Sequence, residues 1–301
     1  MTVLTLVSSR PPLTDDQIAL CKTILKDAGI ENSASDQWLE DGKAIDLFIA
    51  QIPDKSQLVN LRRKMNENSR ENGIDIFVTS PDNRRKKLLI ADMDSTILKG
   101  ETLDELAGKM GLKDKVADIT DKAMRGKMDF HAALKARVEM LKGMKEEDIV
   151  QTIEDLSFNE GARTLVQTLK QNGVVTILVT GGFEQFGRWA AEALGFDHVH
   201  ANRLDIKNGV LTGGVKEPIL DKHEKENLLV HYARIYGIDD SHTMAVGDGA
   251  NDLLMLRKAG IGVGFRAKPK VTRETVNTIT HTDLTSLLYI QGYKSRDIVK
   301  E

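Results

Sequence analysis

The chain has 301 residues, of which 41% are hydrophobic and 29% are charged, a composition typical of a globular protein long enough for roughly two domains. Its net charge of −3 gives no global attraction for nucleic acid or an acidic membrane surface, so neither is expected as a partner. Cys21 is the only cysteine, which excludes an intramolecular disulfide and a cysteine zinc cluster and favours a reducing compartment. Without an apolar run near the ~18 residues of a membrane span, and without a signal peptide in residues 1–12, we expect a cytoplasmic protein.

Residues 1–80 are predicted to form a small α/β domain, because their apolar residues recur with strand and helix periodicity. A strand within 33–40 would complete a βαββαβ order, a ferredoxin-like arrangement found by analogy in small regulatory, ACT-like, amino-acid-binding domains. Residues 81–87 contain four basic residues and are interpreted as a solvated linker rather than a nucleic-acid site. The other predicted strands cover 3–7, 44–52 and 74–78, and the predicted helices cover 15–28 and 55–72.

Residues 88–295 alternate between strand and helix patterns, which favours an α/β fold with a doubly wound, Rossmann-like parallel sheet. The interval 102–156 carries only helical patterns, so we interpret it as a helical cap inserted after the first core strand. Predicted core strands cover 88–91, 174–179, a short segment at 198–202, 242–246 and 260–264, and predicted helices include 161–171 and 226–236.

Four polar clusters follow predicted core strands or lie at the start of a predicted helix. Because ligands of open α/β sheets bind at the carboxyl ends of the strands, these clusters are expected to converge. Alone, each has an ordinary explanation as a strand cap, a tight turn or a surface lysine, but their joint order favours a site. The clusters are Asp92-x-Asp94, Thr180-Gly181-Gly182, Lys225 with Lys222 as a local alternative, and Gly247-Asp248-Gly249-Ala250-Asn251-Asp252.

The residue types in these clusters suit phosphoryl transfer. A carboxylate such as Asp92 can attack phosphorus, and one such as Asp94 can protonate the leaving oxygen and then activate water. Oxygen ligands from Asp92 and Asp248 suit Mg²⁺. The hydroxyl of Thr180 and the glycine amides after it can bind phosphate oxygens, and Lys225 supplies a positive charge.

These motifs resemble those of the haloacid-dehalogenase (HAD) superfamily and, within it, of the phosphoserine phosphatases. The resemblance covers roughly residues 86–292 and rests on Asp92-Met93-Asp94-Ser95-Thr96, Val179-Thr180-Gly181-Gly182-Phe183 and the GDGAND string at 247–252. It implies a HAD core with a helical cap. It also implies Mg²⁺-dependent hydrolysis of O-phospho-L-serine through an aspartyl-phosphate, the last step of serine biosynthesis.

By position, the resemblance implies that Asp92 is the nucleophile and Asp94 the acid/base. It implies that Mg²⁺ is held by Asp92, the main-chain carbonyl of Asp94 and Asp248, with Asp252 supporting the metal shell. The spacing back from Gly247 favours Lys225 over Lys222 as the lysine of the third motif.

The resemblance also implies a set of substrate contacts. In the helical cap, Glu101 would meet the substrate ammonium group and Arg137 its carboxylate, for which a fork of donors is suited. Thr180 stands where the family usually has Ser, so the hydroxyl is kept and a methyl is added. The further implied contacts are Met124 and Phe130 as apolar lid residues, and Thr180, Gly181, Gly182, Lys225 and Asn251 near the phosphate.

Two alternatives remain open at this level. One is a related capped HAD phosphatase or phosphotransferase that acts on another small phosphorylated metabolite. The other is a regulatory amino-acid-binding protein in which residues 1–80 are the sensor and the catalytic core has lapsed. A homodimer formed through residues 1–80 is compatible with either.

Overall fold

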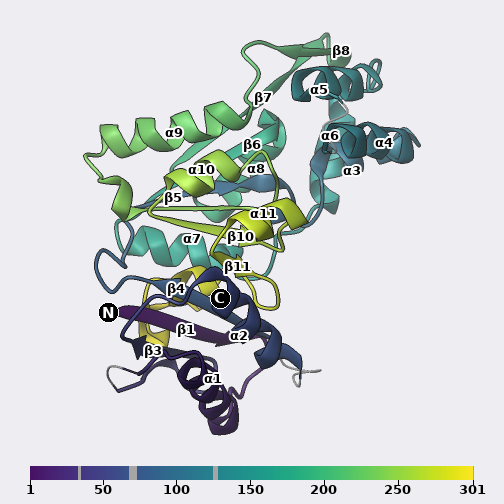
Figure 1. The fold of residues 1–301 in the computed structure, drawn as a ribbon. Helices are drawn as coiled ribbons and strands as arrows, with labels where there is room; N and C mark the ends of the chain where they lie inside the picture. The colour runs from purple at the N-terminus through teal and green to yellow at the C-terminus, as the bar shows by residue number, and fades with distance from the viewer. Residues whose placement is uncertain (33–34, 68–72, 125–127, 301) are drawn as a thin grey trace.

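The computed structural model describes residues 1–32, 35–67, 73–124 and 128–300, apart from the side chains of Asp121 and Met124. It contains two sheets, a four-stranded one in an N-terminal unit and a seven-stranded one in a core that lies above it in Figure 1. Within the described ranges, no helix is both long and apolar enough to cross a membrane.

The N-terminal unit folds in the order βαββαβ around an antiparallel sheet with strand order β2-β3-β1-β4. Strand β1 is buried along its whole length because it pairs with β3 on one side and β4 on the other. Cys21 is fully buried in the apolar core of this unit. Part of the predicted helix 55–72 and of the predicted strand 33–40 lies outside the described residues. The elements are β1 (Thr2–Ser8), α1 (Asp15–Asp27), β2 (Gln37–Glu40), β3 (Ala44–Ile49), α2 (Lys55–Glu67) and β4 (Ile74–Thr79).

The core sheet has the strand order β11-β10-β9-β5-β6-β7-β8 and is parallel except for the β7–β8 pair. Successive residues of the central strand β5 face opposite sides, so Leu89 and Ala91 belong to one apolar cluster and Leu88 and Ile90 to another. Helices therefore cover both faces, as the alternating sequence pattern predicts. The strands are β5 (Leu88–Asp92), β6 (Val175–Phe183), β7 (His198–Lys207), β8 (Val210–Lys216), β9 (Thr243–Gly247), β10 (Ile261–Phe265) and β11 (Asn277–Ile279), and the helices are α7 (Ala162–Gln171), α8 (Glu184–Leu194), α9 (Lys222–Ile235), α10 (Leu253–Lys258), α11 (Pro269–Glu274) and α12 (Ser286–Ile290).

Among the described residues, four helices are inserted between β5 and α7 and lie to one side of the core sheet (Figure 1). The β7–β8 hairpin packs on them, since the Gly143 amide donates to the Leu211 carbonyl at 2.9 Å. The short predicted strand 198–202 is wrong in length, and β8 was not predicted. The overlooked signal is Asn208-Gly209, whose φ angles of 52° and 72° suit a tight hairpin turn. The inserted helices are α3 (Thr102–Gly108), α4 (Lys113–Met124), α5 (Phe130–Glu139) and α6 (Glu146–Asp155).

The N-terminal unit packs on the β11 edge of the core sheet. The side-chain amide of Asn277 accepts from the Val78 backbone N at 2.8 Å and donates to the Val78 carbonyl at 3.1 Å. The buried carboxylate of Asp75 accepts from the backbone N of Thr280 and Thr282 at 3.1 and 2.9 Å. These polar contacts fix one sheet against the other.

The segment 81–87, which was predicted to be a solvated linker, also makes fixed contacts with both units. Arg84 makes a two-pronged ion pair with the buried Asp46, with Nη–Oδ distances of 2.6 and 2.7 Å. The same guanidinium donates to the carbonyls of Tyr289 and Ile290 in α12. Lys86 is only 6% exposed. Arg84 and Lys86, two of the four basic residues, are therefore part of the packed structure and not of a solvated surface.

Candidate active site

Asp92 is the last residue of β5 and is buried at the carboxyl end of the core sheet. The chain then makes an irregular turn, η1 (Met93–Ile97), whose backbone is non-helical at Asp94 and Ser95. Ser95 has a φ of +58°, a value uncommon outside glycine. The Ser95 amide donates to the Gly100 carbonyl at 2.8 Å, and its hydroxyl donates to Glu101 at 2.8 Å. The turn is thus held by its own polar groups directly after the first acid.

The carboxylate of Asp94 lies between the helical insertion and β6. It accepts a hydrogen bond from the Thr102 backbone N at 2.8 Å and one from the Thr180 hydroxyl at 3.0 Å. Burial and, after it, the negative charge of Glu101 raise its pKa to about 6, while the hydrogen bonds from Thr102 and Thr180 act in the opposite direction. Asp94 therefore takes up a proton closer to neutral pH than an ordinary aspartate does.

Lys225 lies in the first turn of α9 and bridges two of the buried acids. It is 1% exposed and forms an ion pair with Asp92 and another with Asp252, the latter at 2.7 Å. The second oxygen of Asp252 accepts from the Gly249 amide at 2.9 Å. Lys222 is exposed on the same turn, so the structure brings Lys225, and not Lys222, to the acids.

Three carboxylates, from Asp92, Asp248 and Asp252, offer oxygens that all lie within 4.8 Å of one another. Burial raises the pKa of Asp92 well above its usual value, and the charge of Asp252 adds to this. Burial likewise raises the pKa of Asp248 to about 6. For Lys225, burial lowers the pKa, but the attraction of Asp252 and Asp92 outweighs it and the pKa is raised. The cluster is therefore short of positive charge even with its lysine protonated.

This donor set fits a hard divalent cation. Carboxylate oxygens are the preferred ligands of such ions, and Asp92 and Asp248 both present them in the cluster. Asp252 is less available, because Lys225 and the Gly249 amide hold its two oxygens. The carboxylate of Asp94 is outside the group, which leaves only its main-chain carbonyl for the implied metal role.

Lys268 is a second cation at this site, and sequence reasoning missed it. Its ammonium group lies 3.1 Å from Asp248 and 3.8 Å from Glu101. Lys268 follows β10, as the predicted acidic clusters follow their strands. Its position after the predicted strand 260–264 was therefore the signal that could have identified it. Lys268 connects the core to the start of the helical insertion.

The Thr180-Gly181-Gly182 cluster lies inside β6 and not in a loop after it, which corrects the predicted strand end at 179. The pairing of β6 with β7 shifts register between Val179 and Phe183, so the strand is irregular there. The Gly182 amide donates to the Thr180 hydroxyl at 2.7 Å. A Cβ at Gly182 would lie 2.8 Å from a carboxylate oxygen of Asp94, so a larger residue would displace that acid.

The predicted residues of the insertion approach this edge of the sheet to different degrees. A Cβ at Gly181 would lie 3.5 Å from the ring of Phe130, so this ring covers the second cluster. Arg137 donates to the Thr120 hydroxyl at 3.1 Å. Its burial lowers its pKa, and the charges of Asp104, Glu101 and Asp94 oppose that shift. Asn251 lies in the turn after β9, and the side chain of Met124 is outside the described residues.

The fold agrees with what comparison to known proteins finds. A model of the haloacid dehalogenase-like hydrolase family matches residues 89–257, more than half of the chain, and the chain belongs to this family. Within it, the chain is similar to proteins named phosphoserine phosphatase. One from Haemophilus influenzae is 41% identical over 72% of this chain and 69% of its own length, and one from Archaeoglobus fulgidus is 39% identical over 75% and 67%.

Solved structures extend the likeness to the N-terminal unit. A HAD family hydrolase from Salmonella enterica serovar Typhi superposes with a TM-score of 0.83 at 27% identity, covering 96% of this chain and 97% of the other. A substrate-bound phosphoserine phosphatase complex superposes with a TM-score of 0.65 at 39% identity, covering 68% of this chain and 98% of the other. The chain is therefore an enzyme of the phosphoserine phosphatase type. Unlike the substrate-bound structure, which covers 68% of this chain, it also has the four-stranded sheet of the N-terminal unit.

Proposed function

We propose that this chain hydrolyses O-phospho-L-serine to L-serine and phosphate, with Mg²⁺ as its cofactor and Asp92 as its nucleophile. The observation that carries the proposal is the buried lysine bridge: Lys225 pairs with Asp92 and Asp252, while Asp248 completes an acidic group within 4.8 Å. The names of the similar proteins support the substrate. The reaction would be the last step of serine biosynthesis, in a reducing cytoplasm that suits a single buried cysteine.

The proposed reaction has two steps at Asp92. First, a carboxylate oxygen of Asp92 attacks phosphorus, and the bond from phosphorus to the serine oxygen breaks while Asp94 gives that oxygen a proton. Then Asp94 takes a proton from water as the water attacks the aspartyl-phosphate, which releases phosphate and restores both carboxyl groups. The raised pKa of Asp94, about 6, suits both directions of this proton transfer.

Other groups would bind the charge that moves through these steps. Lys225 holds one oxygen of Asp92 and so fixes the orientation of the nucleophile. The Thr180 hydroxyl orients Asp94, and the Gly181 and Gly182 amides would bind phosphate oxygens. Bound at Asp92, Asp248 and the Asp94 carbonyl, with Asp252 behind them, Mg²⁺ would neutralise charge on the phosphate.

The helical insertion would act as the substrate-recognising cap. Glu101 would pair with the serine ammonium group and Arg137 with its carboxylate, since both stand among charges that face the Asp94 end of the site. Phe130, together with Met124, would exclude water above Gly181. Asn251 would complete the phosphate contacts. Residues 88–295 then form the catalytic domain, and 1–80 an ACT-like domain that senses an amino acid or mediates a homodimer.

A panel of phosphoesters, assayed with and without EDTA, tests this proposal. We expect phosphoserine to be hydrolysed fastest, and EDTA to abolish turnover until Mg²⁺ is restored. Asp92→Asn should lower kcat by roughly 10⁴-fold or more while the far-UV circular dichroism stays that of the wild type. Asp27→Asn, an exposed acid of α1, serves as the matched control. Faster hydrolysis of another metabolite, or transfer to an added alcohol in place of water, would assign the chain to a different activity.

A further inference from the structure

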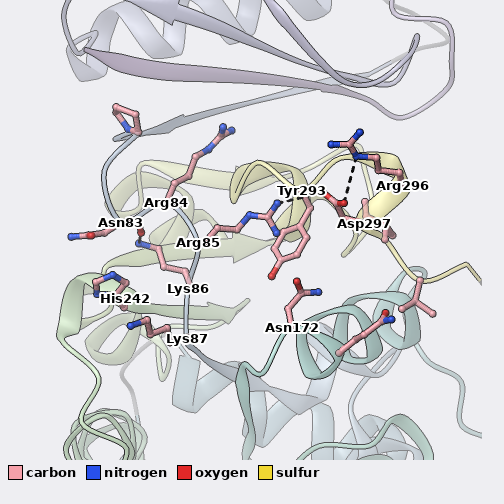
Figure 2. Close-up of a pocket in the computed structure, with 14 residues that line it drawn as sticks. Asn83, Arg84, Arg85, Lys86, Lys87, Asn172, His242, Tyr293, Arg296 and Asp297 are labelled. Atoms are coloured by element: carbon pink, nitrogen blue, oxygen red, sulfur yellow. Dashed lines mark hydrogen bonds and ion pairs between the residues drawn. The ribbon is translucent and has the colours of Figure 1, made fainter.

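A cleft of about 1260 Å³ lies between the segment 81–87 and the C-terminal segment 293–299 (Figure 2). The end of α7 and His242 complete its walls. It opens near Leu88, where β5 begins, whereas Asp92 ends the same strand, about 13 Å further along at ~3.3 Å per residue. The cleft is therefore separate from the candidate active site and independent of the function proposed for it.

The lining of the cleft is strongly basic on a chain whose net charge is −3. Asp297 is the one acid among its lining residues. A concave surface lined by one sign of charge concentrates ions of the opposite sign. The five lysine and arginine residues of the lining are Arg84, Arg85, Lys86, Lys87 and Arg296.

Most of these cations lack a full counter-ion of their own. Arg84 is the exception, because it points away from the cleft toward Asp46 of the N-terminal sheet (Figure 2). Arg85 and Arg296 share the single carboxylate of Asp297, at 3.6 and 3.8 Å. Lys87 is exposed and has no ion pair within the described part of the chain.

Lys86 adds a buried positive charge behind this surface. Its ammonium group donates to the carbonyls of Asn83 and Ser241, at 2.7 and 2.5 Å, but to no carboxylate among the described residues. Two of its three protons are used in this way. A negative ligand in the cleft would be the counter-ion that the fold does not supply.

The backbone that carries these cations is fixed, which argues against an ordinary flexible linker. The Lys86 amide donates to the side chain of Gln291 at 3.0 Å, and the Lys87 amide donates to the His242 carbonyl at 2.8 Å. The guanidinium of Arg85 lies 3.3 Å above the ring of Tyr293. Pre-positioned charges lose less entropy on binding than mobile ones.

The size and surface of the cleft select the kind of anion. Its volume exceeds the need of a single phosphate group, and cations stand on both of its walls. Nucleic acid would be expected to stack bases on exposed aromatic rings, but Tyr293 is 1% exposed and Arg85 covers it. We propose that this cleft binds a small, multiply charged phosphate compound, with at least two linked phosphate groups contacting Lys87 and Arg296 from opposite sides.

Isothermal titration of the full-length chain with tripolyphosphate, in EDTA so that no divalent cation bridges the two, tests this proposal. We expect saturable binding that weakens as ionic strength rises toward about 0.15 M, because surface charges are then screened. The double variant Lys87→Gln/Arg296→Gln should bind at least tenfold more weakly. Its phosphatase activity should equal that of the wild type, since neither residue touches the acidic cluster.

The matched control is Arg10→Gln/Lys26→Gln, which removes two exposed positive charges from the N-terminal unit. It should retain wild-type affinity for tripolyphosphate. Equal losses in the two double variants would reduce the effect to general electrostatics and overturn the proposal. So would an absence of saturable binding by the wild type, or tighter binding of a short single-stranded oligonucleotide than of tripolyphosphate.

Discussion

Replacing Arg84 by methionine should loosen the junction between the N-terminal unit and the core. The guanidinium donates to both oxygens of Asp46 and to the carbonyls of Tyr289 and Ile290. The Asp46 side chain is fully buried, and among the described residues only the Thr5 hydroxyl would remain as a side-chain donor to it. Removing one partner of a buried ion pair costs about 3–5 kcal/mol, a large part of the ~5–15 kcal/mol that stabilises a typical domain.

Two natural probes allow this loss to be located. The chain has two tryptophans; Trp38 lies in β2 of the N-terminal unit and Trp189 in α8 of the core. Urea unfolding followed by fluorescence, in Trp38→Phe and Trp189→Phe backgrounds, reports each unit separately. We expect Arg84→Met to move the Trp38 transition to markedly lower urea and the Trp189 transition by less.

Two further variants make the test decisive. Arg63→Met removes an exposed pair with Glu67 and should change the free energy of unfolding by no more than about 1 kcal/mol. Adding Asp46→Leu to Arg84→Met should recover part of the loss, because no buried charge is then left unpaired. If Arg84→Met shifts neither transition more than Arg63→Met does, the junction does not depend on this ion pair.

Three other expectations concern single side chains. Arg137→Ala should raise the KM for phosphoserine more than that for phosphoethanolamine, which has no carboxylate, and equal effects on both would refute its assigned role. Burial raises the pKa of the Cys21 thiol to about 12, so a thiol reagent at pH 8 should modify the native chain only as fast as it unfolds; rapid modification in native buffer would contradict this burial. Burial lowers the pKa of Lys86 from 10.5 to about 8, so between these values the unfolded chain binds more protons and stability rises with pH. Between pH 8 and 10.5, the free energy of unfolding of the wild type should therefore rise relative to that of Lys86→Met, by at most about 1.4 kcal/mol per pH unit. If the difference between the two proteins stays constant with pH, Lys86 does not titrate as expected.

The sequence predicted well which acids and which lysine gather at the carboxyl end of the core sheet, because the signals there are local. Asp92 follows an unbroken apolar strand, and the family motifs carry Asp248 and Asp252 with it. Lys222 and Lys225 lie on one helical turn, so the local pattern does not show which of them reaches the acids. Only the spacing of the family motifs or the structure itself distinguishes them. Lys268 was not predicted to belong to the site, because its position after a strand is its one local signal.

Contacts between distant segments account for most of what the sequence left out. Nothing near Arg84 in the chain indicates Asp46 or α12 as its partners, so a basic run appeared as a solvated linker. The irregular end of β6 depends on its pairing with β7, which a single strand pattern does not contain. The β7–β8 hairpin, in contrast, was predictable from Asn208-Gly209 and was overlooked.

The polar contacts of Asn277 have a consequence for aggregation. Strand β11 is the last strand of the core sheet, and an uncovered edge strand can pair with the edge of another molecule. The Asn277 amide occupies the backbone N–H and C=O of Val78 in β4, so the N-terminal unit shields this edge. A core cut free of residues 1–80 would therefore present an unprotected edge, and we expect it to self-associate. An experiment that deletes residues 1–80 to test their proposed sensor role must therefore also measure whether the truncated core self-associates.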